Sequence, residues 1–357
     1  MVRMAADTAD ETHVSLIQDI LTKKTRAKDE SLILETLRPL EARALGATLD
    51  ELDLTRLLSA LDDRRWGPKS RKAFLRILAP AVPHLSVESK AKLIRGLAKG
   101  PQEASAESTI THLFRSEQAE RLSQLKLLVD CSRDGKDLLN IIYLFIQSAD
   151  LRYDILQHFL GAAHKGDEPA ELRVVSDIDD TIYSSLKDIR YPKGTIYPGV
   201  LELLSQLSPL PPVFLTARPE LIASLFERVT HKQMARYGIE KCTVLSGSLP
   251  GLMGHRRMAE QKARTLISYR ELYPEYRFIF IGDSGQGDMA LAESLLNRRD
   301  NVLDHAFIHK LAPDQPGSRS NHTQIHVFED YPTAATILNS LGYLTPAQVQ
   351  AVEKSVT

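Results

Sequence analysis

The chain has 357 residues, enough for one large domain or two of ordinary size. It is 43% hydrophobic and 25% charged, so it can bury a core, and its net charge of −1 gives no support to nucleic-acid binding. Cys131 and Cys242 fit no metal or redox spacing and are expected to be buried free thiols. No apolar run approaches the roughly 20 residues that span a bilayer. We therefore expect a cytoplasmic protein, with peripheral membrane contact left open.

The first part of the chain carries a helical pattern. From residue 54 to residue 61, leucines recur at i, i+3, i+4 and i+7, and similar spacing continues to about residue 163. Ser86 stands where an N-cap belongs, and Thr48 with Glu51 has the spacing of a capping box. These patterns predict an all-α domain over residues 1–163, with seven to nine short helices that could form helical hairpins.

The second part of the chain, residues 164–357, alternates short apolar runs with helical stretches. The runs cover residues 172–175, 213–215, 243–245, 278–281, 306–308 and 325–328. The helical stretches cover residues 200–207, 220–237, 255–272 and 286–297. Nearly continuous apolar strands that alternate with helices predict an α/β domain with a parallel sheet covered on both faces.

Carboxylates follow two of these apolar runs. Asp177, Asp179 and Asp180 come directly after the first run, and Asp283 and Asp288 come after the run at 278–281. Like charges this close repel one another unless a cation compensates, and Mg²⁺ takes oxygen ligands. Because the carboxyl ends of parallel strands share one edge of the sheet, we expect Asp177 and Asp283 to meet at a single divalent ion.

This arrangement suits phosphoryl transfer. An ionised carboxylate can attack phosphorus and form an aspartyl-phosphate, which is the role expected for Asp177. Asp179 lies two residues on, on the same side of an extended segment, and is the expected general acid and base. Asp283 is expected to complete the metal site, and Asp288 to be either a ligand through water or an orienting group.

Two further residues are candidates for binding phosphate. Thr216 ends the run at 213–215, at a strand-to-helix turn where a hydroxyl and backbone N–H groups can face an anion. Lys262 lies in the helical stretch before the run at 278–281 and could reach the same phosphate as a point charge. On spacing alone, Lys262 could equally be a surface lysine.

The order Asp-x-Asp-x-Thr at 177–181, strand-Thr216, Lys262 and Gly-Asp-x4-Asp at 282–288 resembles the four motifs of haloacid-dehalogenase (HAD) phosphatases. The motifs within residues 172–340 allow a more specific resemblance to be identified. Ser-Asp-Ile-Asp-Asp-Thr-Ile at 176–182, Tyr-Pro-Gly at 197–199, Gly-Ser-Leu at 247–249 and Gly-Asp-Ser-Gly-Gln at 282–286 resemble the catalytic domain of the actin-patch-type phosphatidate phosphatases, which are relatives of the lipins.

The resemblance implies a HAD-like three-layer domain with a minimal cap, since residues 182–199 leave room only for a short flap. It implies Mg²⁺ as cofactor, held by the side chains of Asp177 and Asp283 and the backbone carbonyl of Asp179, with phosphate bound by Thr216 and Lys262. It also implies a phosphomonoester phosphatase acting on phosphatidate or a related phospholipid.

Two alternatives stay open at this point. The chain could be a HAD phosphatase for a soluble nucleotide, sugar phosphate or phosphoprotein, because residues 288–290 and 216–219 depart from the lipid phosphatase pattern. It could also be a helical protein-interaction module with an accessory phosphatase domain. The partner of the helical part is not readable from the sequence, and no nucleic-acid partner is expected.

Overall fold

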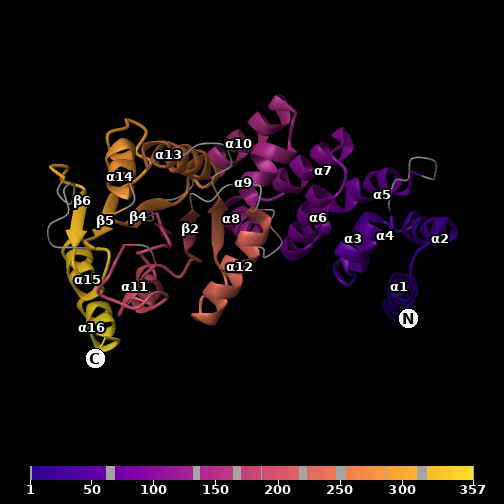
Figure 1. The fold of residues 1–357 in the computed structure, drawn as a ribbon. Coiled ribbons are helices and arrows are strands. Elements are labelled where there is room, and N and C mark those ends of the chain that lie inside the picture. The colour runs from indigo at the N-terminus through magenta and orange to yellow at the C-terminus, as the bar shows by residue number, and fades with distance from the viewer. Residues whose placement is uncertain are drawn as a thin grey trace. The chain divides into compact units, whose positions relative to one another are not determined.

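The computed structural model describes residues 2–61, 69–131, 137–163, 170–185, 187–216, 223–246, 255–285, 287–311 and 320–356. The chain divides into two compact units (Figure 1). The first comprises Met1–Asp130 and Leu138–Lys165, and the second comprises Cys131–Asp137 and Gly166–Thr357. Residues 164–169 lie outside the described part, so the domain boundary placed at 163/164 stays a prediction.

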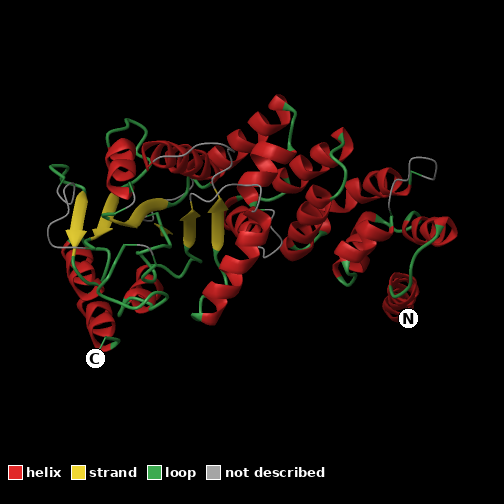
Figure 2. Ribbon diagram, in the orientation of Figure 1, coloured by secondary structure: helices red, strands yellow, loops and turns green. Residues whose placement is uncertain are grey.

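In the described residues up to 163, every regular element is a helix, as Figure 2 shows in red. The elements are α1 (Val2–Leu21), α2 (Ala27–Leu37), α3 (Ala42–Asp50), α4 (Leu54–Ala60), α5 (Ser70–Leu78), the 3-10 helix η1 (Ala79–His84), α6 (Val87–Lys99), α7 (Ala104–Arg115), α8 (Ala119–Asp130), α9 (Leu138–Asn140), the π-helix η2 (Ile141–Phe145) and α10 (Ala149–Ala163). Ten α-helices exceed the seven to nine expected, in part because α9 is a separate three-residue helix that leads directly into η2.

The helix caps confirm one prediction and correct another. The Ser86 hydroxyl accepts the N–H of Ser89 at 3.2 Å and caps α6, as expected. The capping box at Thr48 is wrong, because Thr48 lies buried inside α3. The cap in this region is Asp53, whose carboxylate accepts the N–H groups of the second and third residues of α4 at 3.1 Å.

A buried ion pair joins α6 to the turn after α7. The Lys90 Nζ donates to Glu117 Oε1 at 2.5 Å, and the two side chains are only 1% and 5% exposed. Arg121 also donates to this carboxylate, through Nε at 2.7 Å and Nη2 at 2.9 Å. Burial alone would raise the pKa of Glu117, but the bonds from Arg121 and Lys90 outweigh it and lower the pKa below its ordinary value.

We expect Lys90→Met to lower the free energy of unfolding of the helical unit by about 3 kcal/mol, because it leaves the Glu117 carboxylate buried with less compensation. Arg121→Met is the matched control. The Arg121 side chain is 59% exposed, so its removal is expected to cost about 1 kcal/mol or less. Urea unfolding followed by circular dichroism measures both changes. Equal losses in the two variants would contradict this account of the pair.

The second unit contains a six-stranded parallel sheet, drawn in yellow in Figure 2. Its strands are β1 (Leu172–Ser176), β2 (Val213–Thr216), β3 (Thr243–Ser246), β4 (Arg277–Asp283), β5 (His305–His309) and β6 (Ile325–Phe328). The order across the sheet is β3-β2-β1-β4-β5-β6, and every neighbouring pair is parallel. The predicted α/β class and parallel sheet are therefore confirmed.

Helices cover both faces of this sheet, which gives three layers (Figure 1). The helices of this unit are α11 (Val200–Leu207), α12 (Ala223–Arg236), α13 (His255–Leu272), α14 (Asp288–Leu296), α15 (Tyr331–Ser340) and α16 (Pro346–Lys354). Residues of α11, α12, α15 and α16 share one buried cluster with the sheet, while α13 and α14 lie on the opposite face.

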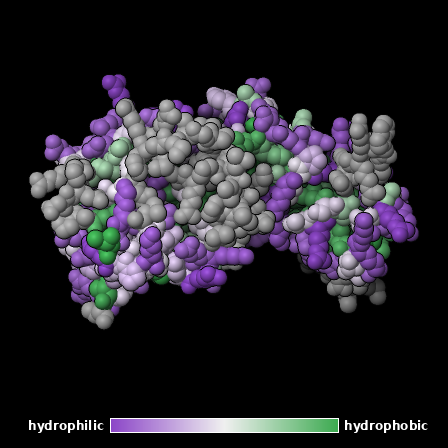
Figure 3. Space-filling model, in the orientation of Figure 1, coloured by the Kyte–Doolittle hydropathy of each residue, from purple (hydrophilic) through white to green (hydrophobic). Residues whose placement is uncertain are grey.

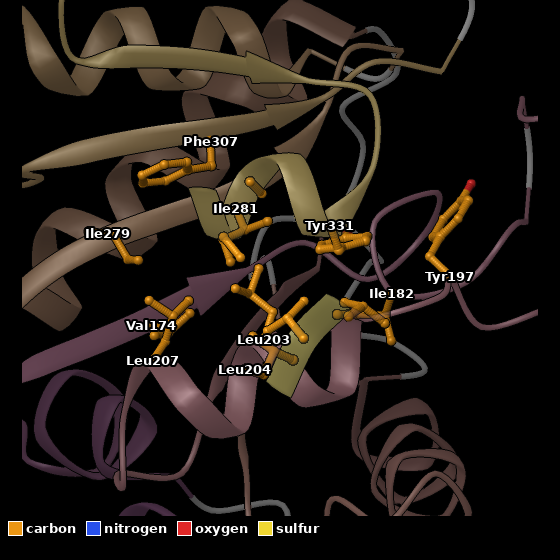
Figure 4. Packing of buried hydrophobic residues seen from close by; sticks show 14 of the residues in the cluster. Val174, Ile182, Tyr197, Leu203, Leu204, Leu207, Ile279, Ile281, Phe307 and Tyr331 are labelled. Atoms are coloured by element: carbon orange, nitrogen blue, oxygen red, sulfur yellow. The ribbon is translucent and has the colours of Figure 1, made fainter. Parts of the chain in front are cut away.

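The side chains of the central strands explain this packing. Val174 of β1 and Ile279 and Ile281 of β4 point toward Leu203 and Leu204 of α11 (Figure 4). Side chains alternate along a strand, so Val175, Phe278 and Phe280 face α13 and α14. The buried Arg173 points to the same face, where its Nη2 donates to the Tyr269 hydroxyl of α13 at 2.7 Å. Burial on both faces accounts for the nearly continuous apolar runs in the sequence and leaves the carboxyl edge of the sheet as the place for polar groups.

Two other expectations from composition can be compared with the structure. Cys131 and Cys242 are free thiols; Cys242 is buried, whereas Cys131 is only half-buried. None of the helices in the described ranges is long and apolar enough to cross a membrane. On the face drawn in Figure 3, outside the grey atoms, hydrophobic residues form small separate areas among hydrophilic ones.

Candidate metal centre and active site

The central strands β1 and β4 bring three carboxylates together at the carboxyl edge of the sheet. Ser176 and Ile281 are partners in the ladder, so Asp177 and Asp283 leave neighbouring strands. Asp177 donates its backbone N–H to the Ile281 carbonyl at 2.8 Å, which extends the ladder by one bond. Asp177, Asp283 and Asp288 each offer an oxygen within 4.8 Å of the others, and all three are buried.

Two glycines permit the turn from β4 into α14. Gly287 has φ +96°, a left-handed conformation that favours glycine, and α14 begins directly after it at Asp288. A Cβ at Gly282 would lie 2.6 Å from Asp288 Oδ2, so only glycine leaves space for this carboxylate. The same Oδ2 accepts the Asp283 N–H at 3.3 Å, which fixes the Asp288 side chain against the end of the strand.

Lys262 reaches the same group of carboxylates from α13. Its Nζ donates to Asp177 Oδ1 at 2.6 Å and to Asp288 Oδ1 at 2.8 Å. The residue is only 5% exposed, so the alternative of a surface lysine is wrong. Burial alone would lower the pKa of Lys262, but Asp177 and Asp288 outweigh it and raise the pKa above its ordinary value. Lys262 is therefore a fixed positive charge beside the expected nucleophile.

The single positive charge of Lys262 does not neutralise the negative charge of three buried carboxylates. Burial, together with repulsion from Asp288, raises the pKa of Asp177 to about 7 despite Lys262. Burial and repulsion from Asp288 and Asp177 raise the pKa of Asp283 to about 9. The Asp283 Oδ2 atom is also buried without a hydrogen-bond partner. Excess negative charge and an unpartnered carboxylate oxygen fit a hard divalent cation, for which Asp177, Asp283 and Asp288 supply oxygen ligands.

Asp179 stands apart from these three side chains. It is half-buried, and its Oδ1 accepts hydrogen bonds from Tyr183 Oη at 3.2 Å and Ser185 Oγ at 2.8 Å. These bonds orient the carboxylate from the segment that follows it. The metal contact predicted for Asp179 is made by its backbone carbonyl. The group of three carboxylates concerns side-chain oxygens only, so this role of Asp179 stays a prediction.

Asp180 turns the chain into the predicted flap, residues 182–199. It has φ +61°, a left-handed conformation that aspartate tolerates better than most residues. Its carboxylate accepts the N–H groups of Ser185 at 2.7 Å and Lys187 at 2.8 Å. Asp180 therefore shapes the flap and lies outside the carboxylate group. The flap closes on itself through a bridge between Tyr183 and Ile196.

Sequence reasoning missed the residues that fix the far part of the flap. The buried Asp188 carboxylate accepts Arg190 Nη2 at 2.8 Å and Tyr197 Oη at 2.9 Å. These hydrogen bonds outweigh the effect of burial and lower the pKa of Asp188. Arg190 also donates to the Lys310 carbonyl at 3.1 Å, just after β5, and His309 packs edge-on against Tyr197. One partial signal is present in the sequence, the Tyr-Pro-Gly motif that begins at Tyr197.

The flap also touches the loop between Asp283 and Asp288. The Nζ of Lys187 donates to the carbonyl of Gly285, and the Gly285 N–H donates to Asp283 Oδ1 at 2.5 Å. Thr216 ends β2, next to β1 and paired in register with Ser246 of β3. Residues 217–222, which form the predicted anion-binding turn, lie outside the described part of the chain. The phosphate role of Thr216 therefore stays a prediction.

Comparison with known families agrees with this geometry. Residues 172–310 match the family model described as the catalytic domain of phosphatidate phosphatase APP1. The matched range includes β1 to β5, the flap, Lys262 and the aspartates of this site. A search of curated proteins and a search of solved structures found no match. The family match confirms the resemblance to the actin-patch-type phosphatidate phosphatases and supports a phosphatase activity.

Proposed function

We propose that this chain, whose residues 172–310 match the APP1 catalytic-domain family, is a Mg²⁺-dependent phosphatase that hydrolyses the phosphomonoester of phosphatidate or a related phospholipid. One observation carries the proposal: Asp177, Asp283 and Asp288 converge within 4.8 Å, with Lys262 bonded to two of them. This arrangement supports a metal and phosphate site in which Asp177 attacks the phosphorus.

Asp177 acts as the nucleophile. Its free carboxylate oxygen attacks phosphorus, an Asp177–phosphorus bond forms, and the bond from phosphorus to the ester oxygen breaks. Asp179 gives a proton to the departing oxygen and then takes one from the water that attacks the aspartyl-phosphate. Water supplies the oxygen that leaves with the phosphate, and Asp177 is regenerated. Tyr183 and Ser185 hold the Asp179 carboxylate in position throughout.

Positive charge stabilises the phosphoryl group in transfer. The side chains of Asp177, Asp283 and Asp288 and the carbonyl of Asp179 would hold Mg²⁺. When bound, the ion would neutralise negative charge on the phosphate and on Asp177. Lys262 adds a fixed positive charge beside Asp177. Asp288 accepts a second hydrogen bond from Lys262 and so orients the lysine side chain. The Thr216 hydroxyl, at the end of the strand next to β1, completes the phosphate site from the β2 side.

The small cap favours a bulky substrate. Between β1 and α11, the described residues form only the short flap, and the elements described between β2 and β4, in residues 223–246 and 255–276, are α12, β3 and α13. An enzyme without a lid domain leaves its site accessible to a phosphate group carried on a membrane surface. This feature favours a phospholipid over a nucleotide or a sugar phosphate.

A substrate panel tests the proposal. The full chain with Mg²⁺ is expected to release phosphate from phosphatidate in mixed micelles, and EDTA is expected to stop the reaction. Glucose 6-phosphate, nucleoside monophosphates and a phosphoserine peptide serve as soluble comparisons. If these esters are hydrolysed well and phosphatidate is not, the soluble-substrate alternative holds instead. Absence of phosphate release from every ester would contradict the phosphatase assignment itself.

A further inference from the structure

In the described part of the flap, one apolar side chain lies almost entirely in solvent. Ile189 is 97% exposed, more than any other large hydrophobic residue in the described part of the chain; the next, Tyr153 in the helical unit, is 63% exposed. Single exposed apolar residues are common on protein surfaces and by themselves carry no function. Ile189 differs in how its backbone is held and in what surrounds it.

The residues on both sides of Ile189 are fixed. Asp188 is buried and bonded to Tyr197, while Arg190 donates both to Asp188 and to the Lys310 carbonyl. At the base of the flap, the Asp180 carboxylate accepts the N–H groups of Ser185 and Lys187. The flap therefore cannot turn Ile189 inward without breaking buried hydrogen bonds, so the exposure is part of the fold.

The segment that carries Ile189 is rich in basic residues. In residues 187–199 the basic residues are Lys187, Arg190 and Lys193, and the only acidic one is Asp188, which is buried and paired with Arg190. Lys193 is exposed, four residues beyond Ile189. An apolar side chain with basic residues beside it is the combination that binds the headgroup region of an anionic bilayer.

The flap is also tied to the catalytic residues. It begins at residue 182, just beyond Asp179 and Asp180, and Lys187 donates to the Gly285 carbonyl in the loop that joins Asp283 to Asp288. We infer that the flap tip is an interfacial anchor, in which Ile189 enters the headgroup region of an anionic lipid surface and Lys193 contacts lipid phosphates. This inference rests on the proposed function, because it gives the phosphatidate-containing membrane as the surface that the flap meets.

Vesicle co-sedimentation of the full chain tests the anchor. The probes are phosphatidylcholine vesicles with and without phosphatidate, in EDTA so that no lipid is consumed. We expect Ile189→Ser to weaken binding to the phosphatidate vesicles by about tenfold. Lys193→Glu is expected to weaken it by about fivefold or more, and less at high salt. Leu341→Ser and Lys232→Glu, exposed positions of the same unit, are the matched controls and should bind as wild type.

A second measurement separates binding from chemistry. With a short-chain phosphatidate below its micelle concentration, Ile189→Ser and Lys193→Glu are expected to keep the wild-type kcat and KM. On vesicles, both variants should show reduced turnover at low lipid concentration. Wild-type vesicle affinity in Ile189→Ser would overturn the anchor, and would leave contact with another protein as the role of this residue.

Failure of the anchor and failure of the proposed function give different results. If the wild-type chain hydrolyses dispersed phosphatidate but Ile189→Ser binds vesicles normally, the activity stands and the anchor is wrong. If no form of phosphatidate is hydrolysed, the function is wrong. Binding to phosphatidylserine vesicles would then show whether the flap still selects an anionic surface.

Discussion

Asp177→Asn is expected to lose phosphatase activity by roughly 10⁴-fold or more, with no loss of folding. The amide has the size of the carboxylate but cannot attack phosphorus. The substitution also removes one negative charge from the group of buried carboxylates. Burial and repulsion from Asp288 raise the pKa of Asp177, so the loss of this charge is expected to relieve repulsion in the folded protein. The assay is Mg²⁺-dependent phosphate release from phosphatidate, with circular dichroism as the check on folding.

Asp304→Asn is the matched control for this experiment. Asp304 precedes β5 at the opposite edge of the same sheet, where it pairs with Arg277 near the surface. This change should leave kcat near the wild-type value, because the residue is remote from the carboxyl ends of the strands. If Asp177→Asn retained wild-type activity, the nucleophile would have to be another group, and the whole assignment of roles at this edge would fail.

In the absence of metal, the protein is expected to become less stable as the pH rises from about 4 to about 9. The folded state raises the pKa of Asp177 to about 7 and of Asp283 to about 9, above the ordinary value of 3.8. Between these values the folded protein holds more protons than the unfolded chain, so stability falls with rising pH, by up to about 1.4 kcal/mol per pH unit for each group. Mg²⁺ should restore stability most strongly above pH 7.

Thermal unfolding of wild type and Asp283→Asn, in EDTA and in Mg²⁺, measures this effect. The asparagine variant removes a buried charge, so in EDTA at about pH 8.5 we expect it to melt above the wild type, with little or no activity. It should also show little change in Tm on addition of Mg²⁺. Histidines such as His309 titrate in both proteins, so the difference between the two isolates the carboxylates. An equal Mg²⁺ effect on both proteins would contradict this metal site.

Much of the second unit could be predicted from sequence because its signals are local. Each strand is a short apolar run, and each group of carboxylates follows one, so parallel pairing was enough to place Asp177 beside Asp283. The final helix α16 begins at a local signal too, with Thr345 in a capping box and proline at the first helical position. In these cases the chemistry of a few neighbouring residues decides the local structure.

The remainder depends on contacts between distant residues. Asp188 and His309 lie 121 positions apart (309 − 188 = 121) and carry no motif, so nothing in either segment indicates that both help to fix the flap. Lys262 illustrates the same limit, since a lysine on a helix is ordinarily a surface residue and only the tertiary fold buries it. At Thr48 a local pattern was misleading, because packing placed that residue inside a helix.

The position of β1 in the middle of the sheet has a consequence for synthesis of the protein. Asp177 leaves the ribosome 106 residues before Asp283 (283 − 177 = 106), which is about 5–20 s at usual translation rates of roughly 5–20 residues per second. The helical unit, built from neighbouring segments, can fold during that interval. α11 and β2 emerge early enough to contact β1, but the other edge of β1 lacks its partner until β4 emerges. Chaperone binding to the nascent chain is therefore expected to concentrate between these two points.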